Sequence, residues 1–287
     1  MDYAALIENR KSVRSFVDRQ VEEDLLREIR RFYEKDCHRL DPILSVELEI
    51  LESAACPQLE QTAGYGENTV GAPYYLVLFG EDQPQARMNA GYMMEDLVLK
   101  LEDLGLQSCF VTLGDPEKAA ALLPGREGLT VQAVIAFGYG KVQEKKLRVN
   151  LLSMSCVDVI AQRGYYSPKK DIRDLVNVDT LDNIRGLDEK IGFYEDMLWQ
   201  SFYAVTKTPS YLNRQPYVFL LKDGKVMLVS LPDPYTDRIS ADLGLGIAML
   251  HFSVIGEKWT GKIVWDFTEK QSFDLPSDCR IAAVCTP

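Results

Sequence analysis

The sequence PYYLVL at residues 73–78 and the sequence PYVFLL at residues 216–221 decide the fold class. Each is a proline followed by an apolar run of the kind that forms a buried β-strand. The second begins 143 residues after the first, and half of the 287-residue chain is 143.5 residues. In each half the strand leads to a long apolar helical pattern, and a further apolar strand closes the half. This order predicts two tandem copies of one half-length unit.

The apolar periodicity around these strands predicts an α+β fold, in which each half is a mainly antiparallel sheet with packed helices. Charged and apolar residues alternate over 45–52, as in a half-buried strand. A long helical pattern ends at Gly105, a residue that commonly caps helices. We expect helices over 21–35, 90–104 and 243–258, strands over 45–52, 73–80, 131–139, 261–267 and 280–285, and a hairpin over 217–229 that turns at Asp223-Gly224.

The two copies divide the chain into two domains and a connector. We expect the first half to span residues 1–166 and the second half residues 189–287. The polar stretch over 167–188 is the natural connector between them.

Composition excludes several classes of function. With 32 basic and 43 acidic side chains the net charge is −11, so the chain lacks the basic surface that nucleic acids and anionic membranes require. No apolar run reaches the ~18 residues of a membrane span. The six cysteines form no CxxC pair, and we assign no metal site. The first residues do not show the pattern of a signal peptide, and we expect a soluble, cytoplasmic protein.

A basic segment near the N-terminus is a candidate phosphate site. Arg10, Lys11, Ser12 and Arg14 place three cations and a hydroxyl within five residues, directly after a short helical pattern. Arginine offers a planar fork of donors to a phosphate, and serine offers a short one. Composition alone favours the alternative interpretation of this segment as a solvated helix end.

A proline-bracketed loop in the second half is a candidate site for a planar heterocycle. The segment TPSYLNRQPY occupies residues 208–217 and enters a buried strand. Pro209 restricts the backbone, while Ser210, Asn213 and Gln215 offer hydroxyl and amide groups that could pair with the edge of a ring. Taken alone, the loop could also be an ordinary turn.

Together the two segments resemble the nitroreductase family. The pattern RxSxRxF over 10–16 is similar to that family's flavin-phosphate arm, and PSxxNxQPY over 209–217 looks like its flavin-ring loop. In the family, each flavin mononucleotide (FMN) lies across a homodimer interface and takes the arm and the loop from opposite subunits. Here each motif occurs once, in opposite halves of one chain. The resemblance therefore implies an internally duplicated, single-chain pseudo-dimer with one composite site.

The same resemblance implies further contacts with FMN. Tyr211 and Leu212 belong to the ring loop, and the segment Thr112-Leu113-Gly114 is similar to the backbone that faces the flavin, although it could be a simple turn. Lys146 and Arg148 resemble a K-x-R pair that adds charge to the phosphate, although such a run is often a solvated face. His251 lies in a segment that resembles the subgroup's central helix, and we expect it to be a core histidine.

The function that this resemblance implies is that of an FMN-dependent oxidoreductase. A hydride would pass from NADH or NADPH to flavin N5 and then, in a ping-pong scheme, to an electron-poor organic acceptor such as a nitro compound or a quinone. The scheme requires no nucleophile, so we assign no catalytic side chain. The alternatives are a flavin-binding carrier or sensor, a flavin enzyme of other chemistry, and an interaction module that has lost the flavin. We expect a monomeric pseudo-dimer with a small-molecule acceptor as its partner.

Overall fold

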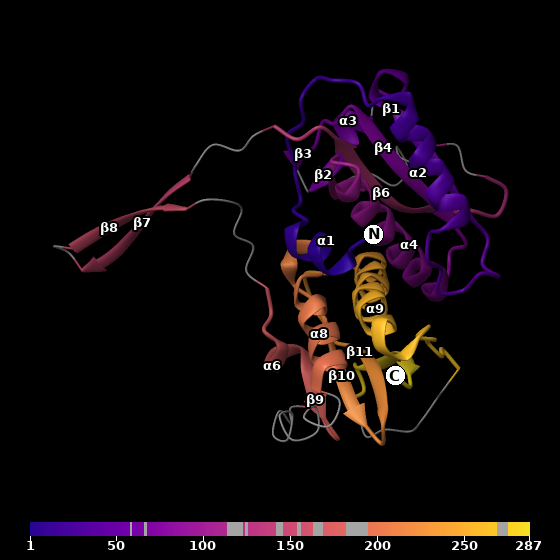
Figure 1. Cartoon of the computed structure of the whole chain (residues 1–287), viewed down its shortest axis with the longest axis vertical. Helices are drawn as coiled ribbons and strands as arrows, with labels where there is room; N and C mark the ends of the chain where they lie inside the picture. The colour runs from indigo at the N-terminus through magenta and orange to yellow at the C-terminus, as the bar shows by residue number, and fades with distance from the viewer. Residues whose placement is uncertain are drawn as a thin grey trace.

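The computed structural model describes residues 1–57, 59–65, 68–113, 123, 126–141, 146–153, 156–162, 169–181, 195–268 and 275–287. Figure 1 shows the two larger sheets, one from each half of the chain, with the two long helices α4 (Pro84–Asp103) and α9 (Arg238–Thr260) between them. The alternation of helix and strand agrees with the predicted α+β class.

The first half is built on a six-stranded sheet in the order β1-β4-β6-β5-β2-β3. All of its pairings are antiparallel. Its core lies between the sheet and the helices α2 and α4. The elements of this sheet and its helices are α1 (Tyr3–Asn9), α2 (Glu23–Lys35), β1 (Val46–Glu52), η1 (Ser53–Ala55), α3 (Leu59–Thr62), β2 (Ala63–Tyr65), β3 (Asn68–Thr69), β4 (Tyr74–Gly80), α4, β5 (Gln107–Leu113) and β6 (Thr130–Gly138).

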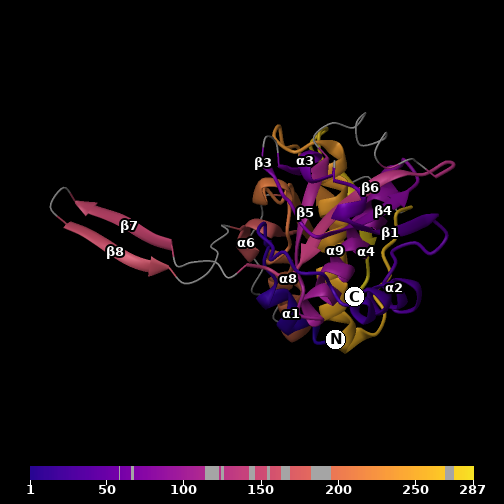
Figure 2. The same cartoon turned by 90° about the horizontal axis from the view of Figure 1, so that it is seen from above.

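A separate hairpin follows the first sheet. Strands β7 (Lys146–Ser153) and β8 (Cys156–Gln162) pair antiparallel with each other and form a two-stranded sheet of their own. Figures 1 and 2 show this hairpin to one side of both larger sheets.

The second half is built on a four-stranded sheet in the order β12-β11-β10-β9. Strand β9 is parallel to β10, and the other pairings are antiparallel. Asp223 and Gly224 have φ angles of 50° and 74°, which explains why the hairpin turns where the Asp-Gly pair predicts. The elements of this half are α6 (Ile172–Leu175), β9 (Val176–Val178), α8 (Glu195–Thr206), η2 (Tyr211–Asn213), β10 (Tyr217–Lys222), β11 (Lys225–Ser230), α9 and β12 (Arg280–Cys285).

The crossing of α4 and α9 reveals the internal symmetry of the fold. A Cβ atom added to Gly91 would lie 2.1 Å from the carbonyl oxygen of Leu243, and one added to Gly246 would lie 1.9 Å from that of Met88. Gly246 follows Gly91 by 155 residues, and Leu243 follows Met88 by the same number. The two helices therefore meet in a pseudo-twofold contact in which the backbones pack directly on each other.

This symmetry changes the predicted alignment of the two halves. Strand β4 lies between two antiparallel neighbours and leads into α4, and in the second half β11, rather than β10, has that position before α9. The likeness of 73–78 to 216–221 reflects a shared strand composition. The predicted duplication holds, but the offset of the central helices is 155 residues instead of 143.

Most predicted elements are present with ends shifted by one or two residues, while α4 begins six residues and α9 five residues before the predicted start. The expected strand over 261–267 is an exception, because only Asp266 makes an isolated bridge, to Val284. The division into 1–166, 167–188 and 189–287 remains a prediction. Within the expected connector, however, β9 is already a strand of the second sheet.

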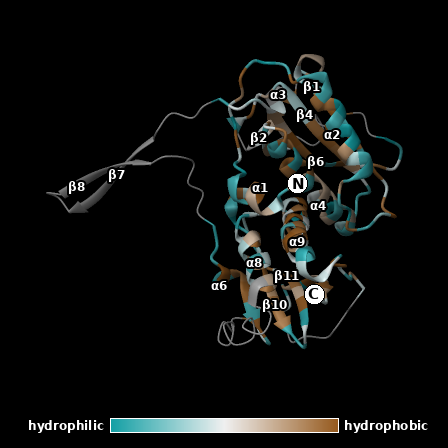
Figure 3. Ribbon diagram, in the orientation of Figure 1, coloured by the Kyte–Doolittle hydropathy of each residue, from teal (hydrophilic) through white to brown (hydrophobic). Residues whose placement is uncertain are grey.

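Helix α9 is the most apolar of the long helices that the structure describes. Among the described residues it is the one helix long and apolar enough to span a membrane, and 78% of its most apolar stretch is buried inside the protein. Figure 3 shows this helix as a hydrophobic rod between the two sheets, whereas α2 carries hydrophilic residues on its outer face.

Candidate functional site

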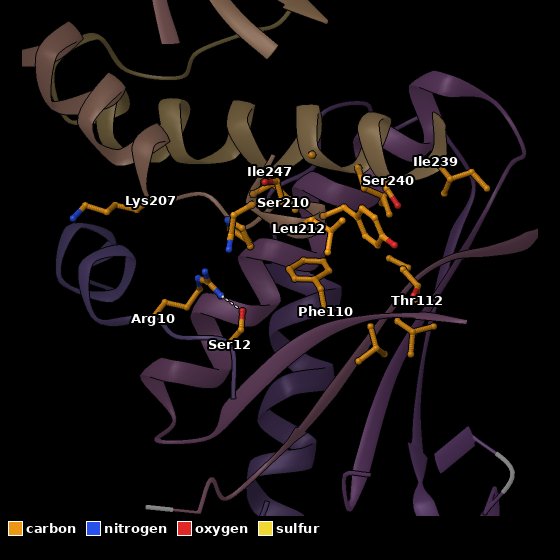
Figure 4. A pocket seen from close by; sticks show the side chains of 18 of the residues that line it. Arg10, Ser12, Phe110, Thr112, Lys207, Ser210, Leu212, Ile239, Ser240 and Ile247 are labelled. Atoms are coloured by element: carbon orange, nitrogen blue, oxygen red, sulfur yellow. Dashed lines mark hydrogen bonds between the residues drawn. The ribbon is translucent and has the colours of Figure 1, made fainter. Parts of the chain in front are cut away.

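The basic arm and the proline-bracketed loop line one cavity of about 1590 Å³, although they come from opposite halves of the chain. Strands β5 and β6 and the first turns of α9 form much of the rest of its walls, together with residues of β3, α6 and α8. In Figure 4, Arg10 and Ser12 lie at one end of the cavity, Phe110, Leu212 and Ile247 in its middle, and Thr112, Ile239 and Ser240 toward the other end.

The arm is held in an extended conformation by the first sheet. Helix α1 ends at Asn9, and the backbone then turns to extended angles at Arg10. The amide of Val13 donates to the carbonyl oxygen of Ser108 over 2.9 Å, and that of Lys141 donates to Ser15 over 2.9 Å. These backbone bonds fix the arm along β5 and the end of β6. They direct Arg10, Lys11, Ser12 and Arg14 to the cavity, which all four line.

Arg10 is the most buried cation of the arm. Its side chain is 6% exposed, and its Nε lies 3.5 Å from Oε1 of Glu95, a fully buried residue of α4. Nη1 of Arg10 donates to Oγ of Ser12 over 3.5 Å, a long hydrogen bond. The guanidinium is therefore held from behind by a carboxylate, and Nη1 points to the arm hydroxyl.

The proline-bracketed loop has an unusual backbone. The φ angles of Leu212, Asn213 and Gln215 are 50°, 56° and 44°. These values lie in the left-handed region, which residues other than glycine and asparagine rarely adopt. Such strain persists only where the surroundings impose it, and it is concentrated at functional sites. Pro209, Ser210, Tyr211, Leu212 and Asn213 all line the cavity.

Gln215 has a different position from the one predicted. It is fully buried and is not among the described residues that line the cavity. Its Nε2 donates to Oγ1 of Thr208 over 3.1 Å, and its Oε1 accepts from the amide of Lys170 over 2.9 Å. Its amide therefore holds the loop in shape, so Gln215 supports the site from behind.

Two lysines of the expected connector belong to the site, and sequence reasoning missed them. Nζ of Lys169 donates to the carbonyl oxygens of Lys207 and Thr208, and Nζ of Lys170 donates to that of Gln215 over 2.8 Å. Both lysines line the cavity. Burial, followed by the positive charges of Arg10 and Lys207, lowers the pKa of Lys169 from 10.5 to about 7, and the negative charge of Glu95 opposes this shift. Burial also lowers the pKa of Lys170. The sequence offered only the pair Lys169-Lys170 as a sign of this role, and the sequence analysis placed that pair in a polar connector.

The remaining predicted residues divide into three groups. Thr112 and Leu113 line the cavity, and Oγ1 of Thr112 donates to the carbonyl oxygen of Gly64 over 2.8 Å. Gly114 lies outside the described residues. Lys146 and Arg148 lie in β7, in the separate hairpin, and their contact with a phosphate stays a prediction.

His251 is a core histidine, as expected. It is fully buried, with Nδ1 at 2.9 Å from the carbonyl oxygen of Ala204 and Nε2 at 2.9 Å from Oε1 of Glu95. Within the described part of the chain, no group of three or more His, Cys, Asp or Glu side chains is arranged to hold a metal ion.

The cavity is basic in an acidic protein. Six cationic side chains and three acidic ones occur among its described lining residues, whereas the whole chain has a net charge of −11. Low-dielectric walls strengthen the field of such a cluster, which attracts an anion. The cations are Arg10, Lys11, Arg14, Lys169, Lys170 and Lys207, and the acidic residues are Glu8, Asp171 and Asp237.

This fold and this composite cavity agree with a match to a nitroreductase family. The family model described as "Putative TM nitroreductase" matches residues 2–255. The chain belongs to this family, which confirms the resemblance drawn from the arm and the loop.

A solved structure aligned over the whole chain shows the same fold, and two FMN-bound structures align with about half of it. A protein from Thermotoga maritima, described as a putative nitroreductase, aligns over 100% of this chain and 94% of its own, with 18% identity and a TM-score of 0.59. An FMN complex from Desulfovibrio desulfuricans, described in the same terms, is 20% identical over 53% of this chain and 93% of its own, with a TM-score of 0.43. A nitroreductase with bound FMN from Bacteroides fragilis is 20% identical over 55% of this chain and 100% of its own, with a TM-score of 0.42. No curated protein matches the chain.

Proposed function

We propose that this protein is an FMN-dependent oxidoreductase of the nitroreductase type. The observation that carries the proposal is the meeting of the arm and the ring loop in one cavity of a single chain. The family match and the names of FMN-bound relatives support the same assignment.

The chemistry of the cavity matches the parts of FMN. Arg10, Ser12, Arg14 and Lys169 offer guanidinium, hydroxyl and ammonium donors for a phosphate. Nε of Arg10 is buried and has no hydrogen-bond acceptor among the described residues. Next to this basic end, apolar side chains, among them Phe110 and Ile247, line the middle of the cavity, where a flat ring system would avoid water (Figure 4).

The chain's own residues would bind and orient rather than react. The strained loop would hold Asn213 and Ser210 toward the ring edge, while Gln215 and Lys170 fix the loop from behind. When bound, FMN would supply hydride transfer between NADH or NADPH and an electron-poor organic acceptor such as a nitro compound or a quinone. We therefore assign no catalytic side chain.

The size of the cavity favours an enzyme over a carrier with a filled pocket. Ligand sites usually measure roughly 300–1,000 Å³. At about 1590 Å³ this cavity has room for a cofactor and for a second small molecule beside it. We propose that the protein works as a single-chain pseudo-dimer, because both halves of the site come from one chain.

An absorbance spectrum of the purified protein tests the proposal. A yellow protein whose flavin absorbance bleaches when NADH or NADPH is added without oxygen, and returns when a quinone is added, supports an oxidoreductase. Flavin absorbance that neither nicotinamide bleaches would instead indicate a carrier or a different chemistry. A colourless protein whose melting temperature does not change with added FMN would contradict the proposal.

A further inference from the structure

The two histidines of the chain bind adjacent acidic residues of α4. Nε2 of His251 lies 2.9 Å from Oε1 of Glu95, and Nδ1 of His38 lies 2.9 Å from Oδ2 of Asp96. Both acidic side chains are completely buried. The two neighbours are therefore equally buried but have different partners: among the described contacts, the arm meets Glu95, whereas Asp96 accepts from Tyr3 and His38.

Glu95 connects the core to the basic end of the cavity. Its Oε1 lies 3.5 Å from Nε of Arg10, whereas Ser12 accepts from a different nitrogen of the guanidinium, Nη1. A buried carboxylate at this distance attracts the guanidinium toward α4 without forming a hydrogen bond to Nε, so the donors of Arg10 can still bind another acceptor. The second oxygen of Glu95, Oε2, is buried and has no hydrogen-bond partner among the described residues, so the contacts of Glu95 are made through Oε1.

His251 fixes Glu95 from the other half of the chain. The carbonyl oxygen of Ala204 can only accept, so Nδ1 of His251 carries a proton and donates it. A single proton then lies between Nε2 and Oε1 of Glu95, and either distribution of it keeps the 2.9 Å hydrogen bond. The carboxyl group is thereby held in one orientation by a histidine that is itself anchored to α8.

We propose that Glu95, oriented by His251, is a positioning residue for Arg10 and sets the preference of the site for a flavin with a phosphate over one without. The inference rests on the proposed function, because it assumes that the cavity holds a flavin. A phosphate-bearing flavin gains from a preset guanidinium, since the ordering of a long side chain is then not lost at binding. Riboflavin, which has no phosphate, gains nothing from it.

The test is the ratio of the riboflavin Kd to the FMN Kd in a double-mutant cycle. Arg10→Ala should lower this ratio, because the phosphate loses a donor. Glu95→Ala should lower it about tenfold in the wild-type background and leave it unchanged in the Arg10→Ala background. The matched control is Asp96→Asn, which alters the neighbouring buried carboxylate and should leave the ratio at the wild-type value.

Each other outcome has a definite meaning. A ratio that is unchanged or raised by Glu95→Ala, or that falls equally in the Arg10→Ala background, overturns the inference. Should Glu95→Ala not fold, Glu95→Gln keeps the shape of the side chain, and a wild-type ratio in that variant overturns the inference as well. A wild-type protein that binds neither flavin contradicts the proposed function instead.

Discussion

Arg87 of α4 and Asp242 of α9 form a buried ion pair across the junction of the two halves. Nε of Arg87 lies 3.0 Å from Oδ2 of Asp242, and the two side chains are 9% and 0% exposed. Asp242 follows Arg87 by 155 residues, the same offset that relates the glycines of the helix crossing. The pair therefore connects equivalent positions of the two halves, and Arg280 of β12 binds the same carboxylate.

We expect Asp242→Asn to destabilise the whole chain. The substitution removes the buried one of the two carboxylates that pair with the Arg87 guanidinium, and breaking a buried pair in this way costs about 3–5 kcal/mol. Chemical denaturation measures the effect as a lower midpoint with one shared transition for both halves.

The matched control for this pair is Asp82→Asn. Asp82 also pairs with Arg87, at 2.7 Å, but its side chain is 73% exposed. Exposed pairs contribute at most about 1 kcal/mol. A loss at Asp82 as large as that at Asp242 would contradict the assignment of the buried pair as the connection between the halves.

The close helix crossing predicts a contrast between two glycines of α9. Gly246→Ala would place a methyl group 1.9 Å from the Met88 carbonyl oxygen, so the helices must separate, and we expect a loss of at least about 2 kcal/mol. The methyl group that Gly244→Ala adds has no atom within 4 Å, and alanine has a higher helix propensity than glycine. Thermal unfolding should show a lower Tm for the first variant and an equal or higher Tm for the second. Equal effects would mean that the crossing is looser than described.

The features that could be predicted from the sequence are those that local patterns of residues determine. Periodicity located α2, β4 and α9, and the Asp-Gly pair located the hairpin turn, because each signal lies within one element. Two motifs also predicted that distant segments share one site. The 155-residue offset was not predictable, since it depends on a backbone contact at Gly91 and Gly246 rather than on composition.

The site also contains features that no local pattern encodes. Gln215 belongs to the loop motif, but the direction of its side chain depends on Thr208 and on the amide of Lys170. The role of Lys169 depends on two carbonyl groups about 40 residues away in the sequence. A lysine pair in a polar stretch gives no sign of such burial.

Lys169 should make flavin binding dependent on pH. Its pKa in the folded protein is about 7, below its ordinary 10.5, and its charged neighbours are Arg10, Glu95 and Lys207. A bound phosphate dianion favours the protonated amine of Lys169. Binding of FMN near pH 8 should therefore be accompanied by uptake of a proton by Lys169, and FMN should bind more weakly as the pH rises above about 7. The phosphate, with a second pKa of about 6, is already a dianion there. Calorimetry in two buffers of different ionisation enthalpy measures this uptake.

Two variants separate Lys169 from its neighbour. Lys169→Met should abolish the proton uptake, whereas Lys170→Met should keep it. The same pKa fixes the sign for stability: between pH 7 and 10.5 the unfolded chain binds more protons at this group, so its contribution to stability rises with pH. Lys169→Met should therefore stabilise the flavin-free protein more at pH 6 than at pH 9. Uptake that persists in Lys169→Met would assign the proton to another group.

The composite site predicts that two variants from opposite halves have the same defect. Arg14→Ala removes a cation from the arm, and Asn213→Ala removes an amide from the ring loop, yet both residues line one cavity. Each should weaken flavin retention by about tenfold, the change expected for a lost hydrogen bond to a charged or buried polar group. Equilibrium dialysis followed by absorbance measures the retained flavin. Arg173→Ala, in an exposed position that does not line the cavity, is the control and should retain flavin as the wild type does. Normal retention in Arg14→Ala would mean that the arm and the loop do not bind the same molecule.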